Sequence, residues 1–282
     1  MNLIETFIAQ LNKSESTKSA YRYSLIRFEK WLIEQGKDID KLTPRTVQKY
    51  VNNLENPQNE KDKPKSASSI ARELAAITSF AIFSKQKPAV SGLQVIEKES
   101  ILNTAPKSLN EDELDALIDE VIKDGNKRNI AMVYLLLLSG IRVSELVNLD
   151  IKDVSITSRS ETSYIHIKKG KGNKERKIPF KKEARYKVKE YLDTRTDDCE
   201  ALFVTEKGET KRMGVRNVQK LLSGYGIHPH LLRHTFATLN LKQGKEITLV
   251  ADYLGHLDLN TTRRYTKMTF EEKALALDKV RF

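Results

Sequence analysis

The chain has 282 residues, which is long for one compact domain and natural for two, each large enough to bury its own core. Hydrophobic residues make up 39% and charged residues 31%, which excludes a wholly disordered chain and suits globular domains with a heavily ionised surface. Lys and Arg number 49 against 38 Asp and Glu, a formal net charge of +11, so a polyanion such as nucleic acid is the first partner to consider.

The sequence also excludes several kinds of chemistry. Its one cysteine, Cys199, rules out an intramolecular disulfide and a thiolate cluster for zinc or iron. No phosphate loop of the G-x-x-x-x-G-K-S/T kind occurs, which argues against an ATP-driven machine. No stretch approaches the roughly 20 apolar residues of a membrane span, and the start lacks a cationic leader with a long apolar core, so we expect a cytoplasmic protein.

Residues 1–87 have the pattern of a small helical bundle. A first amphipathic helix is expected to begin at Ser16 or Thr17, either of which is a good N-cap. A second begins at Thr43 with Pro44 in its first turn, and a third follows a polar loop. The apolar positions at three- and four-residue steps are Tyr21, Leu25, Phe28 and Leu32, then Val47, Tyr50, Val51 and Leu54, then Ile70, Leu74, Ile77 and Ala81.

The periodicity fails over residues 88–107, whose proline, glycine and polar content is typical of an interdomain linker. A second domain is expected at 108–282. Asn110 and Glu113 form an approximate capping box at its start, and the apolar run at 130–139 predicts a buried core helix.

Two short β-branched runs follow in the second domain. SYIHIK and RKIPF flank GKGNKE, whose glycine and asparagine content favours a hairpin turn. From Met213 onward the pattern is helical again. The predicted fold class is therefore mainly α with a small antiparallel β-sheet in the C-terminal domain, behind an N-terminal helical bundle.

Most of the histidines lie in one stretch with an arginine and a tyrosine, namely His228, His230, Arg233, His234, His256 and Tyr265. Each histidine alone could be an ordinary core or surface residue. The i, i+4 pair of His230 and His234 could suggest zinc, but Leu231 stands where a metalloprotease helix needs glutamate. We therefore predict no metal site.

Three segments of the second domain resemble the signature motifs of the tyrosine recombinases, the family of phage integrases and chromosome-dimer resolvases. SGIRVSELVNL resembles the first box, GKGNKERKIP the lysine-bearing β-turn, and HPHLLRHTFATLNLKQG with YLGHLDLNTTRRYTKM the second box, all in the family's order and spacing. TKSAYRYSLIRFEKWL is more loosely similar to the helical core-binding domain. The resemblance implies an N-terminal SAM-like core-binding, DNA-binding domain and a C-terminal catalytic domain, in the simple two-domain Xer-like form.

The resemblance assigns roles to particular residues. The expected catalytic set is Arg142, Lys171, His230, Arg233, His256 and the nucleophile Tyr265. Glu145, three residues after Arg142, is expected to orient that arginine, although a plain surface i, i+3 pair is as good an explanation. Only the GKG motif selects Lys171 over Lys174 in the same turn.

These residue types suit the attack of a phenol on a DNA phosphate. A tyrosine with a pKa of about 10 needs its proton removed and the phosphorane charge stabilised. Arg142 and Arg233 offer planar, permanently charged forks to the non-bridging oxygens. His230 is expected to accept the proton of Tyr265 or to bond the phosphate, and His256 to donate to a phosphate oxygen, and these two roles could be exchanged.

Lys171 is the expected general acid that protonates the departing 5′ oxygen. The product would be a 3′-phosphotyrosyl bond, which keeps the phosphodiester energy. A 5′ hydroxyl from a second duplex can then attack it and exchange strands through a Holliday junction. No metal or nucleotide cofactor is predicted.

A basic two-domain chain can close around double-stranded DNA as a clamp. Candidate phosphate contacts are Lys18, Arg22, Arg72 and Lys174, each of which could equally lie on an ordinary solvated face. The resemblance further implies inverted-repeat core sites, a homo-tetramer on two DNA sites, and an amphipathic tail at 270–282 that docks in trans.

The motifs leave the biological role open. Recombination for a mobile element, by transposon cointegrate resolution or by integration and excision, is the favoured hypothesis, with chromosome or plasmid dimer resolution as the alternative. A type IB topoisomerase would use the same chemistry without exchanging partners. A non-catalytic DNA-binding regulator is the alternative from another class, and it is disfavoured because the whole catalytic set is present.

Overall fold

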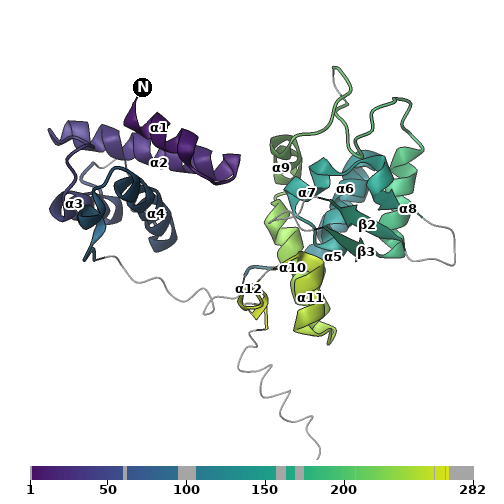
Figure 1. Cartoon of the computed structure of the whole chain (residues 1–282). Helices are drawn as coiled ribbons and strands as arrows, with labels where there is room; N and C mark the ends of the chain where they lie inside the picture. Colours follow the sequence, from purple (N-terminus) through teal and green to yellow (C-terminus); the bar gives the residue numbers. More distant parts are fainter. Residues whose placement is uncertain are drawn as a thin grey trace, which may run out of the picture. The chain divides into compact units, whose positions relative to one another are not determined.

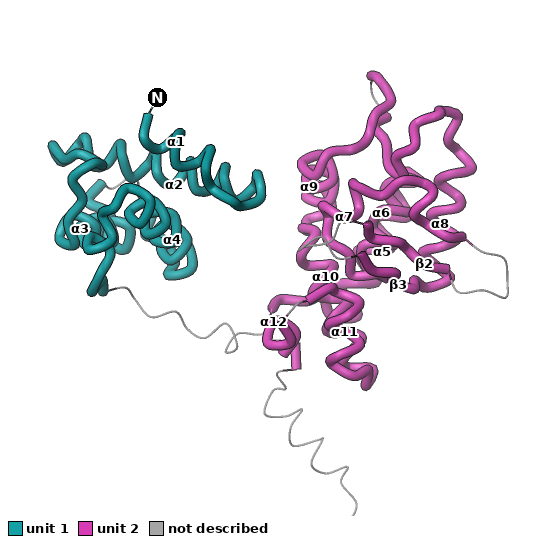
Figure 2. Tube along the Cα trace, in the orientation of Figure 1, with its two compact units in different colours: residues 1–99 teal, residues 100–282 magenta. Residues whose placement is uncertain are grey.

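The computed structural model describes residues 2–59, 62–94, 106–156, 163–168, 175–206, 208–256, 258–263 and 265–266. Its helices and strands are labelled in Figure 1. The chain divides into two compact units, residues 1–99 (unit 1) and residues 100–282 (unit 2), which Figure 2 shows in different colours. The predicted fold class, mainly helical with a small antiparallel sheet, is confirmed. Within the described ranges, no helix is long and apolar enough to cross a membrane.

Unit 1 is a helical bundle. It comprises α1 (Leu3–Gln10), α2 (Glu15–Glu34), α3 (Pro44–Glu55), α4 (Ala67–Phe83) and the short 3-10 helix η1 (Lys87–Val90). Helix α2 begins before the predicted caps because the hydroxyl of Ser14 accepts the backbone N–H of Thr17. Thr43 caps α3 ahead of Pro44, as predicted.

The core of unit 1 is made by the predicted apolar stripes together with two elements that the sequence did not predict. The predicted positions Leu25, Phe28, Leu32, Val47, Tyr50, Val51, Ile70, Ile77 and Ala81 are buried. The unpredicted helix α1 adds Ile4 and Phe7, and Arg22 of α2 donates to both carboxylate oxygens of Glu5. Helix η1 begins where the linker was expected and buries Ala89 in the same core. The proposed domain limits themselves remain a prediction.

Unit 2 begins with the predicted capping box, in which Asn110 accepts the N–H of Glu113 and Glu113 accepts the N–H of Asn110. Its helices are α5 (Glu111–Asp124), α6 (Lys127–Ser139), α7 (Val143–Asn148), α8 (Lys182–Leu192), α9 (Val215–Gly224), α10 (Pro229–Lys242), α11 (Ile247–Leu254) and α12 (Asn260–Arg263), with the 3-10 turn η3 (Ile151–Asp153). Helix α6 is the predicted core helix, and it packs against α8 and α10.

In the part of unit 2 that the structure describes, the sheet has three antiparallel strands in the order β1 (Val154–Ser155), β2 (Tyr164–Ile167) and β3 (Arg176–Pro179). β2 and β3 are the two predicted strands, and β1 was not predicted. Ile165 pairs with Ile178, and both are buried against the core. In the same register Ile167 pairs with Arg176, so an arginine occupies the inward face of β3 beside Ile178.

Candidate active site

The first motif places Arg142 directly after the turn that ends α6. Gly140 closes that helix in the left-handed conformation, with φ of 65°. A Cβ at this position would also overlap the ring of Phe236 on α10. Glycine is therefore required twice, once for the backbone and once for packing. The chain then turns so that Arg142 is the N-cap of α7.

Glu145 lies in the first turn of α7, and its buried carboxylate accepts both the backbone and the side chain of Arg142. Nη1 of Arg142 donates to Oε1 over 3.1 Å, and the backbone N–H of Arg142 donates to Oε2 over 2.8 Å. The guanidinium also donates from Nη2 to the carbonyl oxygen of Gly255 over 3.3 Å. These contacts hold Arg142 at one end of the site with its side chain partly exposed.

A further arginine, Arg176 of β3, shares the carboxylate of Glu145. Its Nη1 and Nη2 donate to Oε1 and Oε2 over 3.0 and 2.9 Å. The motif comparison did not select this residue. A charged side chain on the inward face of a strand must find a partner when buried, but only the register of β2 and β3 shows that Arg176 lies on that face.

The second motif forms the first turns of α10. His228 is the N-cap, and its Nδ1 accepts the N–H of Leu231, while Pro229 occupies the first helical position. The helix brings Arg233 to the centre of unit 2, where its guanidinium is buried. There it donates over 2.6 Å to each of two carbonyl oxygens, those of Gly140 and Leu254.

Tyr265 contacts His234 on α10, a histidine outside the catalytic set expected from the sequence. Its hydroxyl lies 2.7 Å from Nδ1 of His234, and the ring of His234 stacks on that of His230 with 6.1 Å between centroids. The proton acceptor expected from the sequence was His230. The i, i+4 spacing of His230 and His234 predicts that both lie on one face of α10, but from the sequence we considered this spacing only as a possible zinc pair. Among the described residues, no group of three or more His, Cys, Asp or Glu side chains could hold a metal ion.

His256 follows the turn that ends α11. Gly255 adopts φ of 60°, and a Cβ there would lie 2.8 Å from Cζ of Arg176, so the site again requires glycine. Nε2 of His256 lies 3.0 Å from Nη2 of Arg233, and its Nδ1 lies 2.8 Å from the hydroxyl of Thr262 on α12.

Burial and charge shift the titration of three groups in the site. Burial, with the positive charge of Arg142, lowers the pKa of Arg233 to about 9, which still leaves it charged at neutral pH. Partial burial and the charge of Arg233 lower the pKa of His230, which favours its neutral form. Burial alone would raise the pKa of Glu145, but hydrogen bonds from Arg176 and Arg142 outweigh it and lower that pKa.

The structure thus brings Arg142, Glu145, Arg233, His256 and Tyr265 into one contact network, with His230 stacked beside it. The predicted residues Lys171 and Lys174 lie outside the described residues.

The other candidate DNA contacts belong to unit 1. Lys18 forms an ion pair with Glu15 over 3.0 Å, Arg22 is bound to Glu5, and Arg72 on α4 is exposed.

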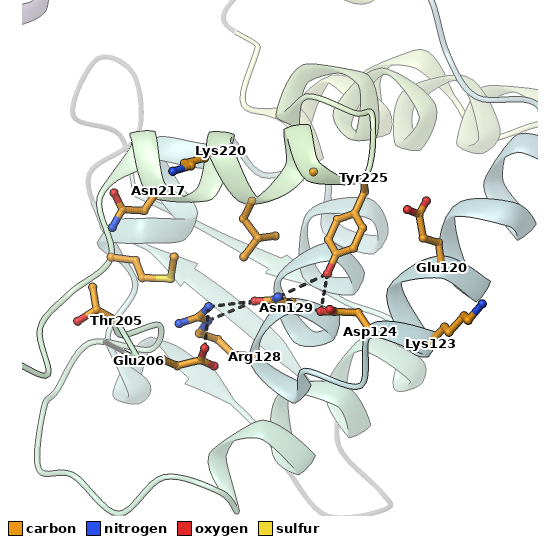
Figure 3. Close-up of a pocket in the computed structure, with 13 residues that line it drawn as sticks. Glu120, Lys123, Asp124, Arg128, Asn129, Thr205, Glu206, Asn217, Lys220 and Tyr225 are labelled. Atoms are coloured by element: carbon orange, nitrogen blue, oxygen red, sulfur yellow. Dashed lines mark hydrogen bonds and ion pairs between the residues drawn. The ribbon is translucent and has the colours of Figure 1, made fainter. Parts of the chain in front are cut away.

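A hollow of about 990 Å³ lies elsewhere on unit 2, next to α5, α6 and α9, and is drawn in Figure 3. The hydroxyl of Tyr225 donates to Asp124 over 2.7 Å in its wall, and Asn129 donates to the same carboxylate over 3.1 Å. None of the predicted catalytic residues that the structure describes lines it. We therefore place the candidate chemistry in the arginine and histidine network.

Comparison with known proteins identifies the family of both units. A family model described as Phage integrase family matches residues 107–272, and one described as Phage integrase, N-terminal SAM-like domain matches residues 3–87. Tyrosine recombinase XerA of Pyrococcus horikoshii is 32% identical over 283 residues, covering 98% of this chain and 91% of the relative. Tyrosine recombinase XerC of Staphylococcus saprophyticus is 34% identical over 277 residues, covering 92% and 88%.

The fold is also shared with the Tn1549 transposon integrase, solved in complex with a circular intermediate DNA. That structure has a TM-score of 0.72 and 17% identity, with 100% of both chains covered. The chain belongs to the tyrosine recombinase family, and it is a site-specific DNA recombinase. The family predicted from the motifs is thereby confirmed.

Proposed function

We propose that the chain cuts DNA by attack of the Tyr265 hydroxyl on a backbone phosphate held by Arg142 and Arg233. The observation that carries this proposal is the 2.7 Å contact between the Tyr265 hydroxyl and Nδ1 of His234, the residue directly after Arg233 on α10. A phenol in contact with an imidazole has a proton acceptor at hand, which is what a tyrosine nucleophile needs.

The proposed step is balanced without a co-reactant. The phenolic oxygen forms a bond to phosphorus, and the bond from phosphorus to the 5′ oxygen breaks. The phenolic proton passes to a histidine, His234 by geometry or His230 as the motif implies. Lys171 supplies a proton to the leaving 5′ oxygen. The 3′-phosphotyrosyl product can be reversed by any correctly placed 5′ hydroxyl, so strand exchange through a Holliday junction needs no energy source.

The electrostatics of the site support this chemistry. Arg142, Arg176 and Arg233 bring three positive charges together, and the carboxylate of Glu145 offsets one of them. The remaining positive charge suits a DNA phosphate and the further negative charge that builds up in the transition state.

The proposed partner is double-stranded DNA with inverted-repeat core sites, bound by a homo-tetramer on two sites. Unit 1 would supply phosphate contacts from Lys18, Arg22 and Arg72. For Lys18 and Arg22 this means exchanging the present carboxylate partners for phosphate. Docking of the tail at 270–282 in trans remains a prediction from the family resemblance, because the tail lies outside the described residues.

For the biological role we retain recombination for a mobile element as the first hypothesis, by cointegrate resolution or by integration and excision. Resolution of chromosome or plasmid dimers is the second candidate. It is favoured by the Xer recombinases that match nearly the whole length of this chain.

The chemistry can be tested with DNA chosen by the protein itself. Duplexes with random cores, selected for retention by the Tyr265→Phe variant, provide the binding site. Wild type, with EDTA and without nucleotide, is then incubated with a nicked suicide form of that duplex. A covalent adduct with a 3′ linkage, absent for Tyr265→Phe, is the expected result. If the wild type binds this duplex and forms no adduct, the chain is a DNA-binding regulator.

A second assay separates exchange from relaxation and distinguishes the roles. A supercoiled plasmid with two directly repeated selected sites should be resolved into two circles by a recombinase. A topoisomerase would relax it without changing its size. The position of the selected sequence, at the ends of an element or at one chromosomal locus, then favours one of the two candidate roles.

A further inference from the structure

Thr262 is a buried hydroxyl residue on the short helix α12 (Asn260–Arg263), which ends two residues before Tyr265. Its side chain is 0% exposed, whereas its neighbour Thr261 on α12 is exposed. The Thr262 hydroxyl lies 2.8 Å from Nδ1 of His256. Its backbone carbonyl accepts the N–H of Tyr265 over 3.0 Å. One residue therefore contacts both the side chain of His256 and the backbone of Tyr265.

The hydrogen-bond pattern determines where His256 carries its proton. A charged guanidinium can only donate, so Nε2 of His256 must accept from Nη2 of Arg233 over their 3.0 Å contact. A neutral imidazole that accepts at Nε2 carries its hydrogen on Nδ1. That hydrogen points at Thr262, whose hydroxyl oxygen accepts it.

The two hydrogen bonds of His256 do not match the role that the sequence predicts for this residue. Donation to a phosphate oxygen was predicted, but in this arrangement Nε2 is an acceptor and the donor nitrogen faces Thr262. His256 is thereby placed to aim the guanidinium of Arg233. A histidine held at its second nitrogen in this way keeps its tautomer and its ring orientation.

We propose that Thr262 is a positioning residue, which fixes the Nδ1–H tautomer of His256 and thus the orientation of Arg233, and which ties both to the segment of Tyr265. The proposal deepens the function proposed above and rests on it for the meaning of the cleavage rate. Through His256, which follows α11, the contact links helix α12 to Arg233 on α10.

Two substitutions at this residue separate the hydroxyl from the methyl group. Thr262→Val keeps the shape and loses the acceptor, and Thr262→Ser keeps the acceptor and loses the methyl. Thr261→Val, on the exposed side of α12, is the matched control. The readouts are the single-turnover cleavage rate on the selected suicide duplex, the dissociation constant for that duplex, and the melting curve.

The proposal expects Thr262→Val to cleave about ten- to a hundred-fold more slowly with little change in DNA affinity, the range given by one lost buried hydrogen bond. Thr262→Ser should recover most of the rate, and Thr261→Val should match wild type. A purely structural role predicts the reverse order, because the serine variant leaves a cavity. Wild-type rates for Thr262→Val, or equal losses for both variants, overturn the proposal.

The tautomer can be read without any cleavage. In nitrogen-15 spectra of the full chain, with His256 assigned from a His256→Gln sample, Nδ1 of wild type should have the shift of a protonated nitrogen and Nε2 that of an unprotonated one. Thr262→Val should lose this pure signature and Thr262→Ser should keep it. A wild-type Nε2–H tautomer refutes the proposal even if cleavage is active. A wild type that forms no adduct but has the expected tautomer refutes only the proposed function.

Discussion

Nη1 of Arg233 donates a 2.6 Å hydrogen bond to the carbonyl oxygen of Gly140, two residues before Arg142. A matching bond runs the other way, because Nη2 of Arg142 donates to the carbonyl of Gly255, which directly precedes His256. Each motif thus supplies a backbone acceptor to an arginine of the other. The two arginines are positioned by backbone turns as well as by side chains.

Replacing Gly140 by alanine should destabilise unit 2. Alanine must adopt φ of 65° there, and its Cβ would overlap Phe236. Together these effects should cost about 2 to 5 kcal/mol in the free energy of unfolding, measured by urea denaturation. Gly224→Ala is the control, because nothing lies within 4 Å of its Cβ position. If the two variants are equally stable, the turn at residue 140 can shift enough to accommodate the added Cβ, and the prediction is wrong.

Replacing Arg176 by lysine should slow cleavage while DNA binding is largely retained. A lysine cannot make two parallel bonds to Glu145, so the buried carboxylate loses part of its neutralisation and Arg142 loses its alignment. We expect a loss of about ten-fold or more in single-turnover rate. Lys177→Met, at the exposed neighbour on β3, should cleave normally. A normal rate for Arg176→Lys would show that Glu145 aligns Arg142 without the paired hydrogen bonds from Arg176.

Replacing His234 by glutamine should remove the proton acceptor that contacts Tyr265. Loss of a general base lowers rates by about a hundred-fold or more, without a matching loss of DNA affinity. His166→Gln, on β2 beside Glu175, is the control histidine substitution. If His234→Gln cleaves normally and His230→Gln does not, the assignment from the motif is the correct one.

His230 should titrate below its ordinary pKa of 6.5, because partial burial and the charge of Arg233 disfavour its protonated form. The unfolded chain therefore binds more protons than the folded chain around this pH. Folding stability from this group is fully present above pH 6.5 and is lost as the pH falls from that value through the lower pKa of the folded chain. Proton NMR titration of the assigned ring, against the urea-unfolded chain, measures both midpoints. A folded-state midpoint above the unfolded one contradicts this expectation.

The apolar periodicity was sufficient to predict α2, α3 and α4, because each buries one continuous stripe. Helix α6 buries nearly its whole surface, so a continuous apolar run predicted it. Helix α1 has only 8 residues, and β1 has only 2, too few to show a period. Their positions depend on packing against distant partners.

The motifs indicated which residues gather in the site, but not which atoms meet. His234 and Tyr265 are 31 residues apart, and Arg176 and Glu145 are also 31 apart. No local pattern encodes such pairings. The position of Arg176 became informative only once the register of β2 and β3 was known.

Among the residues that the structure describes, the hydrophobic cores of the two units have no residue in common. Burial of apolar side chains is the main source of folding free energy, and each unit therefore obtains it from its own core. In evolutionary terms, separate cores allow substitutions to accumulate in the helical bundle without repacking the core that supports Arg233. A shift in DNA preference through unit 1 would then leave the chemistry of unit 2 intact.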